Sequence, residues 1–238
     1  MRSSPSRPDP LDPGPAGFAH RGLHFGSDIP ENSLAAFDAA VEFGAGIECD
    51  LRLTADGRII IFHDADARRL CSSSLQIRKA TWKDLAGLRI SGHPIPLLED
   101  LLQRVAGRVP VLLEVKTQGD VRQWGPVLRR ELAGYTGAFA VLSFDPRLVG
   151  GLRSEMPGVR RGLNVSNDLS ALRRSLAIRH AAPDFLGVER TALGKPWVAR
   201  ARHLMPIYSW TIRTTAERAQ AEVHADALIW ESDGRPRN

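Results

Sequence analysis

Short apolar runs alternate with longer segments of helical periodicity along most of the chain. Brief apolar runs bounded by Gly, Pro or Asp are typical of buried strands, whereas apolar residues every three or four positions are typical of amphipathic helices. Their regular alternation predicts βα units, in which helices connect parallel strands. We expect strands at residues 17–21, 46–53, 109–116, 139–145, 160–166, 185–189, 205–212 and 227–231.

The segments between these strands carry helix signals. In SLAAFDAAVEFG, Ser33 is placed to cap a helix and Gly44 to end it. Eight strands with helical crossovers predict an α/β fold of the TIM (β/α)8 barrel type, and no GxGxxG turn favours a dinucleotide fold instead. Further helices are expected at 97–107, 121–134, 168–180 and 214–222.

Three segments depart from a regular barrel. DGRIIIFHD (56–64) predicts an extra strand after a DG turn, and residues 65–95 are then expected to form a small insertion over one rim. Residues 1–16 are rich in Pro, Ser and Arg and predict a flexible leader before a single domain at 17–238. Few residues follow the eighth strand, so we expect the leader or a partner to replace the final helix.

Composition narrows the class of protein. The 238 residues are 43% hydrophobic and include two cysteines without metal or redox spacing, which favours a reducing compartment. We expect a cytoplasmic protein without stable membrane insertion, because neither a secretory h-region nor a run of about twenty apolar residues is present. The net charge of +5 is scattered over predicted helices, which favours a small anionic ligand over nucleic acid and leaves the oligomeric state open.

Acidic residues alternate with apolar ones on two predicted strands. In IECDLRL, Glu48 and Asp50 share one face with Arg52, and in LLEVK, Glu114 shares a face with Lys116. The apolar residues of the other face must pack on the helices, so the carboxylates should converge inside the barrel mouth.

Three buried carboxylates repel one another and take up protons unless a cation neutralises them. Oxygen ligands favour a hard divalent ion, so Glu48, Asp50 and Glu114 predict a site for Mg²⁺ or Ca²⁺. The alternative is a pair of buried ion pairs, Glu48 with Arg52 and Glu114 with Lys116.

Two histidines end strands on the carboxyl-terminal face, where barrel active sites are built. His20 ends the first strand and His63 ends the hairpin strand, so both are candidates for proton transfer. Arg21 and Lys116 are candidate phosphate ligands, and Trp210 is a candidate wall of the pocket. The other five histidines, among them His24, are expected at the surface or in packing.

These motifs follow one another in a recognisable order. The sequence contains HRG (20–22), PENS (30–33), IECDLRLTADGRIIIFHD (47–64), IPLLEDLL (95–102), LLEVK (112–116), LSFDP (142–146) and SWT (209–211). Together they resemble the glycerophosphodiester phosphodiesterase family over most of residues 17–231. Members of that family are TIM barrels that use a divalent cation to hydrolyse glycerophosphodiesters to glycerol 3-phosphate and an alcohol.

The resemblance implies roles for individual residues. Glu48, Asp50 and Glu114 would hold the metal, His20 would accept a proton, and His63 would donate one. Arg21 would bind the phosphate, while Glu31 and Asn32 would fix the first loop against the metal cluster. The attacking hydroxyl is left open between water and the neighbouring hydroxyl of the substrate's glycerol.

The chain departs from the family pattern at two strand ends. The seventh strand usually continues as WTVN, but here Arg213 follows SWTI, and the eighth usually ends in TD, but here Trp230 and Glu231 stand there. We expect these changes to affect substrate choice and closure of the barrel. The alternatives are a phospholipase D-like lyase acting on lysophospholipids and a non-catalytic barrel that binds an anion.

Overall fold

A closed ring of eight parallel strands forms the centre of the molecule. The computed structural model describes residues 11–236. Each strand of the ring pairs with the next, and the last pairs with the first. The prediction of a TIM barrel is therefore confirmed. The strands are β1 (Phe18–His20), β2 (Gly46–Leu53), β6 (Val111–Val115), β7 (Phe139–Ser143), β8 (Arg160–Val165), β9 (Phe185–Glu189), β10 (Ile207–Ile212) and β11 (Ala227–Trp230).

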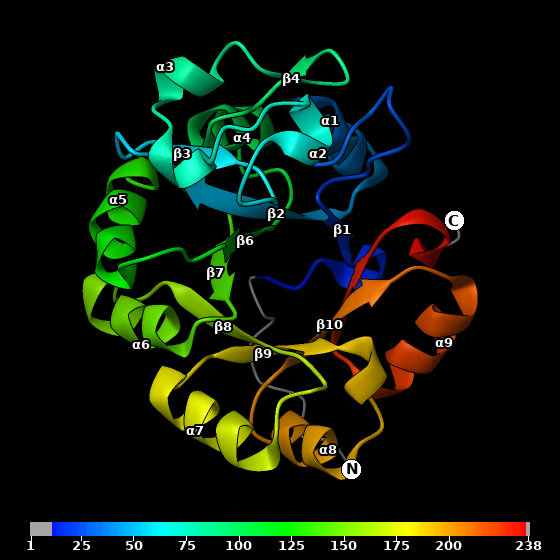
Figure 1. Ribbon diagram of the computed structural model, residues 1–238. Coiled ribbons are helices and arrows are strands. Elements are labelled where there is room, and N and C mark those ends of the chain that lie inside the picture. The colour runs from blue at the N-terminus through cyan, green and yellow to red at the C-terminus, as the bar shows by residue number, and fades with distance from the viewer. Residues whose placement is uncertain (1–10, 237–238) are drawn as a thin grey trace.

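Helices surround this ring (Figure 1). They are α1 (Leu34–Phe43), α4 (Leu98–Val105), α5 (Trp124–Glu131), α6 (Pro146–Glu155), α7 (Ala171–Ala181), α8 (Pro196–Arg202) and α9 (Thr215–His224). The predicted ends of α1 are confirmed: the Ser33 hydroxyl accepts a hydrogen bond from the Ala36 amide, and Gly44 adopts a left-handed conformation. Within residues 11–236, no helix has the length and apolar character needed to cross a bilayer.

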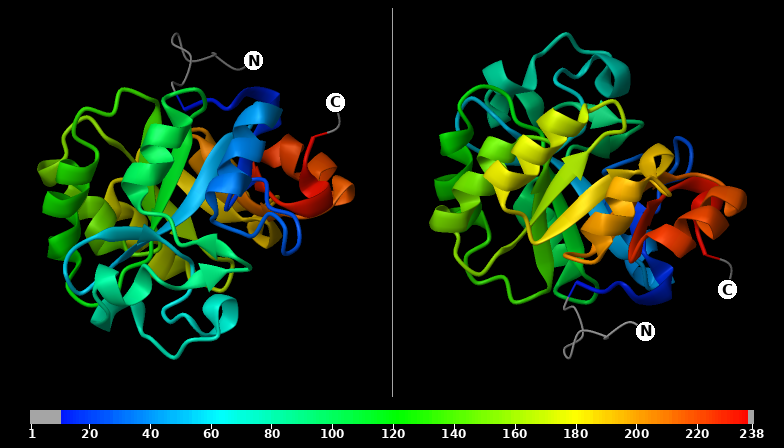
Figure 2. Two further views of the ribbon diagram at one scale, coloured as in Figure 1. Left: turned by 90° about the horizontal axis from the view of Figure 1, so that it is seen from above. Right: turned by 90° about the horizontal axis from the view of Figure 1, so that it is seen from below.

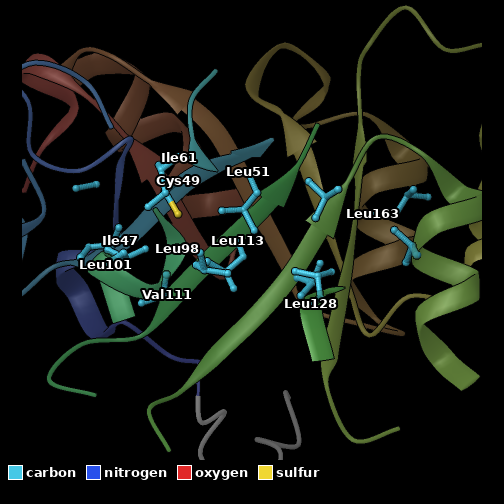
Figure 3. Close-up of a cluster of buried hydrophobic side chains, with 14 of the residues drawn as sticks. Ile47, Cys49, Leu51, Ile61, Leu98, Leu101, Val111, Leu113, Leu128 and Leu163 are labelled. Carbon is cyan, nitrogen blue, oxygen red and sulfur yellow. The ribbon is translucent and has the colours of Figure 1, made fainter. Parts of the chain in front are cut away.

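Alternation along the strands divides the core into two parts. Outward side chains such as Cys49 and Leu51 pack with Leu98 and Leu101 of α4 in the layer between barrel and helices (Figure 3). Inward side chains fill the barrel itself with a cluster that includes Phe18, Leu112, Leu142, Phe185, Tyr208 and Ile229. The apolar filling ends where the inward positions become polar, at the carboxyl ends of the strands.

An additional subdomain follows β2. The predicted extra strand is present as β3 (Ile59–Ile61), antiparallel to β2. Between β3 and α4 the chain forms α2 (Arg68–Cys71), η2 (Ile77–Lys79), α3 (Trp82–Leu85), β4 (Arg89–Ile90) and β5 (His93–Pro94). This insertion has a small apolar core of its own, which includes Phe62, Ile77 and Leu85.

Residues 11–16 pack against the other end of the barrel from the insertion (Figure 2). The Leu11 side chain is 1% exposed and joins the inner cluster, and the indole of Trp230 donates a hydrogen bond of 2.6 Å to the carbonyl of Ala16. The ring of Phe43 in α1 also contacts Trp230. These residues cover β11, after which the described residues contain only the short helix η5 (Ser232–Gly234). The rest of the expected leader, residues 1–10, lies outside the described residues.

Candidate active site

The three predicted carboxylates meet inside the barrel mouth. Glu48 and Asp50 are two residues apart on β2, and Asp50 is the register partner of Glu114 on the neighbouring β6. Their exposed fractions are 2%, 0% and 7%, and one oxygen from each lies within 4.8 Å of the others. The alternation of the two strands therefore brings the predicted ligand set together as expected.

Two cations already contact this cluster. Lys116 Nζ lies 2.9 Å from Asp50 Oδ1 and also contacts Glu114 Oε1, while Arg21 Nε lies 3.2 Å from Asp50 Oδ2. One of the two ion pairs considered as an alternative, Glu114 with Lys116, is thus present alongside the cluster. It does not account for Glu48.

The other ion pair is not formed. Arg52 shares the inward face with Glu48, but its guanidinium extends to the hairpin and its Nε donates to the carbonyl of His63 at 2.9 Å. The donors of this long side chain bind the carbonyl of His63, two residues after the end of β3, and do not reach the cluster. Arg52 therefore holds the backbone of His63 in place.

The charges of the cluster do not balance. Burial raises the pKa of Asp50, but attraction to Lys116 and Arg21 outweighs it and keeps this pKa well below its ordinary value. Burial and repulsion from Asp50 and Glu114 instead raise the pKa of Glu48 well above its ordinary value. Among the three acids, Glu48 is the one that the charged groups of Lys116 and Arg21 do not contact.

The donor set fits a hard divalent cation. All three ligands are carboxylates, which is the chemistry that Mg²⁺ and Ca²⁺ prefer. In addition, Glu48 Oε1 is buried without a hydrogen-bond partner. A buried carboxylate oxygen is normally satisfied, so this atom is an available ligand position.

His20 is oriented by a carboxylate from the far end of the chain. Its Nδ1 lies 2.6 Å from Glu231 Oε2, and its Nε2 lies 4.0 Å from Glu48 Oε2. When Nδ1 carries the proton and donates to Glu231, Nε2 presents a lone pair toward the metal cluster. Burial lowers the pKa of His20, which favours this neutral form.

His63 has the same kind of partner, a carboxylate near its Nδ1. Its Nδ1 lies 2.7 Å from Asp64 Oδ1, and the other oxygen of Asp64 accepts a hydrogen bond of 2.6 Å from Arg69 Nε. Burial lowers the pKa of His63, although the charge of Asp50 acts in the opposite direction. Both histidines thus use Nδ1 for an orienting carboxylate.

Glu31 joins these groups into a chain of ion pairs. Its Oε1 lies 2.7 Å from Arg21 Nη1 and 2.8 Å from Arg69 Nη2. Because Arg69 also binds Asp64, the chain connects Arg21 to the partner of His63. Glu31 therefore supports the site through the two arginines and not by contact with the carboxylate cluster.

Asn32 contacts the cluster directly. Its side-chain amide donates to Asp50 Oδ2 at 2.8 Å, and its Oδ1 accepts from the Asp50 amide at 3.3 Å. Its backbone amide donates to the carbonyl of Arg21 at 2.9 Å. Arg21 and Asn32 both adopt positive φ values, of 58° and 56°, and the bond from the Arg21 amide to Glu48 Oε2 helps to hold this uncommon conformation.

The third residue of the HRG motif, Gly22, occupies a position that requires glycine. Its φ is +77°, and a Cβ atom there would lie 2.8 Å from both the backbone and the side chain of Ala36 in α1. No L-residue combines that conformation with that close approach.

We expect Gly22→Ala to lower the free energy of unfolding by about 2–4 kcal/mol, from the left-handed conformation and the overlap together. Urea denaturation measures this change. Gly26→Ala is the matched control, because Gly26 has a φ of +57° with nothing near its Cβ position, and should cost only about 1 kcal/mol. Equal losses in the two variants would contradict the packing argument.

Two aromatic side chains lie near the carboxyl ends of the strands, and one of them, Phe144, has its ring centroid 6.0 Å from Lys116 Nζ. The rings of Trp210 and Phe144 meet edge to face, with centroids 5.3 Å apart. Trp210 also packs on the inner apolar cluster, and its Nε1 is buried without a hydrogen-bond partner. Trp210 therefore lies at the edge of the barrel filling, and its role as a wall of the substrate site stays a prediction.

Several groups in the site were not identified from the sequence. Asp64, Arg69 and Glu231 complete the surroundings of the two histidines, and only Asp64 had a local signal, since it directly follows His63. His24, expected at the surface or in packing, is half-buried, and its Nε2 lies 3.9 Å from Glu231 Oε2. Asp145 caps α6: its side chain accepts a hydrogen bond from the Arg147 amide.

Comparison with known proteins agrees with this arrangement. The model of the glycerophosphoryl diester phosphodiesterase family matches residues 20–232. The Bacillus subtilis protein YhdW is 29% identical over 224 residues, which cover 86% of this chain and 89% of that relative.

Solved structures share the fold. An Oleispira antarctica phosphodiesterase in complex with sn-glycerol-3-phosphate has a TM-score of 0.81 at 22% identity, and covers 92% of this chain and 94% of its own. The Thermotoga maritima glycerophosphodiester phosphodiesterase has a TM-score of 0.74 at 24% identity, with coverage of 90% and 92%. Because the family model spans both histidines and all three carboxylates, this chain belongs to the glycerophosphoryl diester phosphodiesterase family.

Proposed function

We propose that this protein hydrolyses small glycerophosphodiesters to glycerol 3-phosphate and an alcohol, with a divalent cation bound by Glu48, Asp50 and Glu114. The observation that carries the proposal is the buried cluster of three carboxylates between two histidines whose Nδ1 atoms are each held by an acid. When bound, the cation would neutralise charge on the phosphate oxygens.

The side chains then divide the proton transfers. His20 Nε2 removes the proton from the attacking hydroxyl, and His63 donates a proton to the departing alkoxide. Glu231 and Asp64 stabilise the imidazolium forms that arise during these steps. Arg21 and Lys116 lie beside the cluster and add positive charge where the phosphate would sit, as the transition state requires.

The aromatic wall supports a small organic substrate. Trp210 and Phe144 offer an apolar face to the glycerol or alcohol part of the diester, and Phe144 lies beside Lys116 of the charged cluster. The soluble glycerophosphodiesters glycerophosphocholine and glycerophosphoethanolamine combine these features.

Metal removal tests the proposal. Purified protein should release glycerol 3-phosphate from glycerophosphocholine or another member of a glycerophosphodiester panel, and EDTA should reduce this rate at least about 100-fold. Addition of excess Mg²⁺ or Ca²⁺ after EDTA should restore the rate, which controls for irreversible damage. No release from any member of the panel with either ion would reject the proposed function.

A further inference from the structure

The two positions at which this chain departs from the family pattern lie side by side. Arg213 follows β10 and Glu231 follows β11, and the last register pair of these strands joins Ile212 to Trp230. The next residues along each strand are therefore neighbours. Their side chains are bonded, with Arg213 Nε 2.6 Å from Glu231 Oε1.

The same register argument places Glu231 beside His20. The last recorded pair of β1 with β11 joins Ala19 to Trp230, so His20 and Glu231 come next on adjacent strands. Arg213, Glu231 and His20 thus form a row across three strand ends. Each oxygen of the Glu231 carboxylate has one near partner: Oε1 binds Arg213, and Oε2 binds His20 Nδ1 at 2.6 Å.

We propose that Arg213 and Glu231 form a positioning pair, in which Arg213 fixes the carboxylate so that Glu231 sets the tautomer and ring orientation of His20. The kinetic consequences of this inference rest on the proposed function. Its consequence for the tautomer of His20 does not. His24 does not compete for the role, because its distance of 3.9 Å from Oε2 is too long for a hydrogen bond.

The pair acts by determining which ring nitrogen of His20 carries the proton. An ionised carboxylate only accepts hydrogen bonds, so Glu231 requires the proton on Nδ1 and leaves the Nε2 lone pair free. A glutamine at the same position can donate as well as accept, and so permits the proton on Nε2, which removes the basic atom from the site. Arg213 is 51% exposed, so its contribution is the smaller one.

Nitrogen-15 NMR of the histidine-labelled, metal-free protein tests the tautomer directly. His20 should be the Nδ1–H tautomer in the wild type and should shift toward the Nε2–H tautomer in Glu231→Gln, with the signal assigned by its loss in His20→Ala. An unchanged tautomer in Glu231→Gln would overturn the proposal, whatever the protein's activity.

Kinetics test the coupling. Glu231→Gln should lower kcat on the order of 10²- to 10⁴-fold with KM nearly unchanged. Arg213→Gln should lower kcat about 2- to 5-fold in the wild type and not at all in the Glu231→Gln background. Arg104→Gln is the matched control, because Arg104 is 52% exposed and pairs with Asp38 in the helical layer. Equal costs of Arg213→Gln in both backgrounds would overturn the role of Arg213.

The two proposals fail in different ways. A wild-type protein that turns over none of the glycerophosphodiesters rejects the proposed function, while the NMR measurement still decides the tautomer. Wild-type turnover together with an unaffected Glu231→Gln variant rejects only the positioning pair.

Discussion

His20→Ala is expected to lower kcat for glycerophosphodiester hydrolysis by about 10²- to 10⁴-fold, because it removes the group that accepts the proton of the attacking hydroxyl. The imidazole is 12% exposed and reaches the cluster from the end of β1. No other histidine takes its place: His24 Nε2 lies 3.9 Å from Glu231 without a hydrogen bond, and His63 is engaged with Asp64.

Two measurements separate this loss from unfolding. His20→Ala should retain the wild-type melting temperature within a few degrees, since the ring makes one strong hydrogen bond and lies at a strand end. The control is His93→Ala, because His93 binds the carbonyl of Asp28 outside the carboxylate cluster and should leave kcat unchanged. Wild-type turnover in His20→Ala would remove this residue from the mechanism.

Glu48→Gln is expected to abolish stabilisation by divalent cations as well as turnover. A cation present at about 100 times its dissociation constant stabilises the wild type by about 2.7 kcal/mol. For a domain of this size that corresponds to a rise in melting temperature of about 5–10 °C. The variant lacks one of the three anionic ligands and should show almost no rise.

The same substitution should leave the metal-free fold intact. Glu48 lies beside two other buried acids whose charges help to raise its pKa, so a neutral amide of equal size relieves repulsion. The metal-free melting temperature of Glu48→Gln should therefore equal or exceed that of the wild type. Glu99→Gln, an exposed acid paired with Arg58, is the control that should keep the full response to cations.

Thermal unfolding with and without Mg²⁺ or Ca²⁺ measures both effects. A wild-type response that persists undiminished in Glu48→Gln would place the cation elsewhere. A large loss of metal-free stability in this variant would contradict the argument from repulsion, because a glutamine oxygen can also accept the hydrogen bond from the Arg21 amide.

Strand periodicity accounts for the parts of the site that the sequence predicted. A period of two along β2 and β6 places Glu48, Asp50 and Glu114 on inward positions whatever the details of packing. The same periodicity requires Cys49 and Leu51 to face the helices, where they are buried. The convergence of the carboxylates therefore follows from the pattern once a barrel is assumed.

The partners of those residues could not be predicted in this way. Alternation places Arg52 on the face of Glu48 but does not give the direction of a long side chain, which reaches the His63 carbonyl instead. Glu231 is 211 residues from His20, and their contact depends on the register with which the last strand closes the barrel. The residues around His20 and Glu231 do not by themselves indicate that register.

Residues 11–16 illustrate a further limit. Their proline-rich composition is typical of a flexible segment, yet Leu11 is buried in the barrel filling and Ala16 binds Trp230. A single buried apolar side chain can anchor such a segment. The average composition of the segment does not reveal one contact of this kind.

The seam between β1 and β11 has a consequence for biosynthesis. At this seam the first strand of the ring, β1, pairs with the last, β11, and His20 contacts the carboxylate of Glu231 there. A nascent polypeptide still attached to the ribosome cannot complete this pairing until residue 231 has left the exit tunnel. We therefore expect a chain truncated before Glu231 to lack the hydrogen bond that orients His20, the proposed proton acceptor.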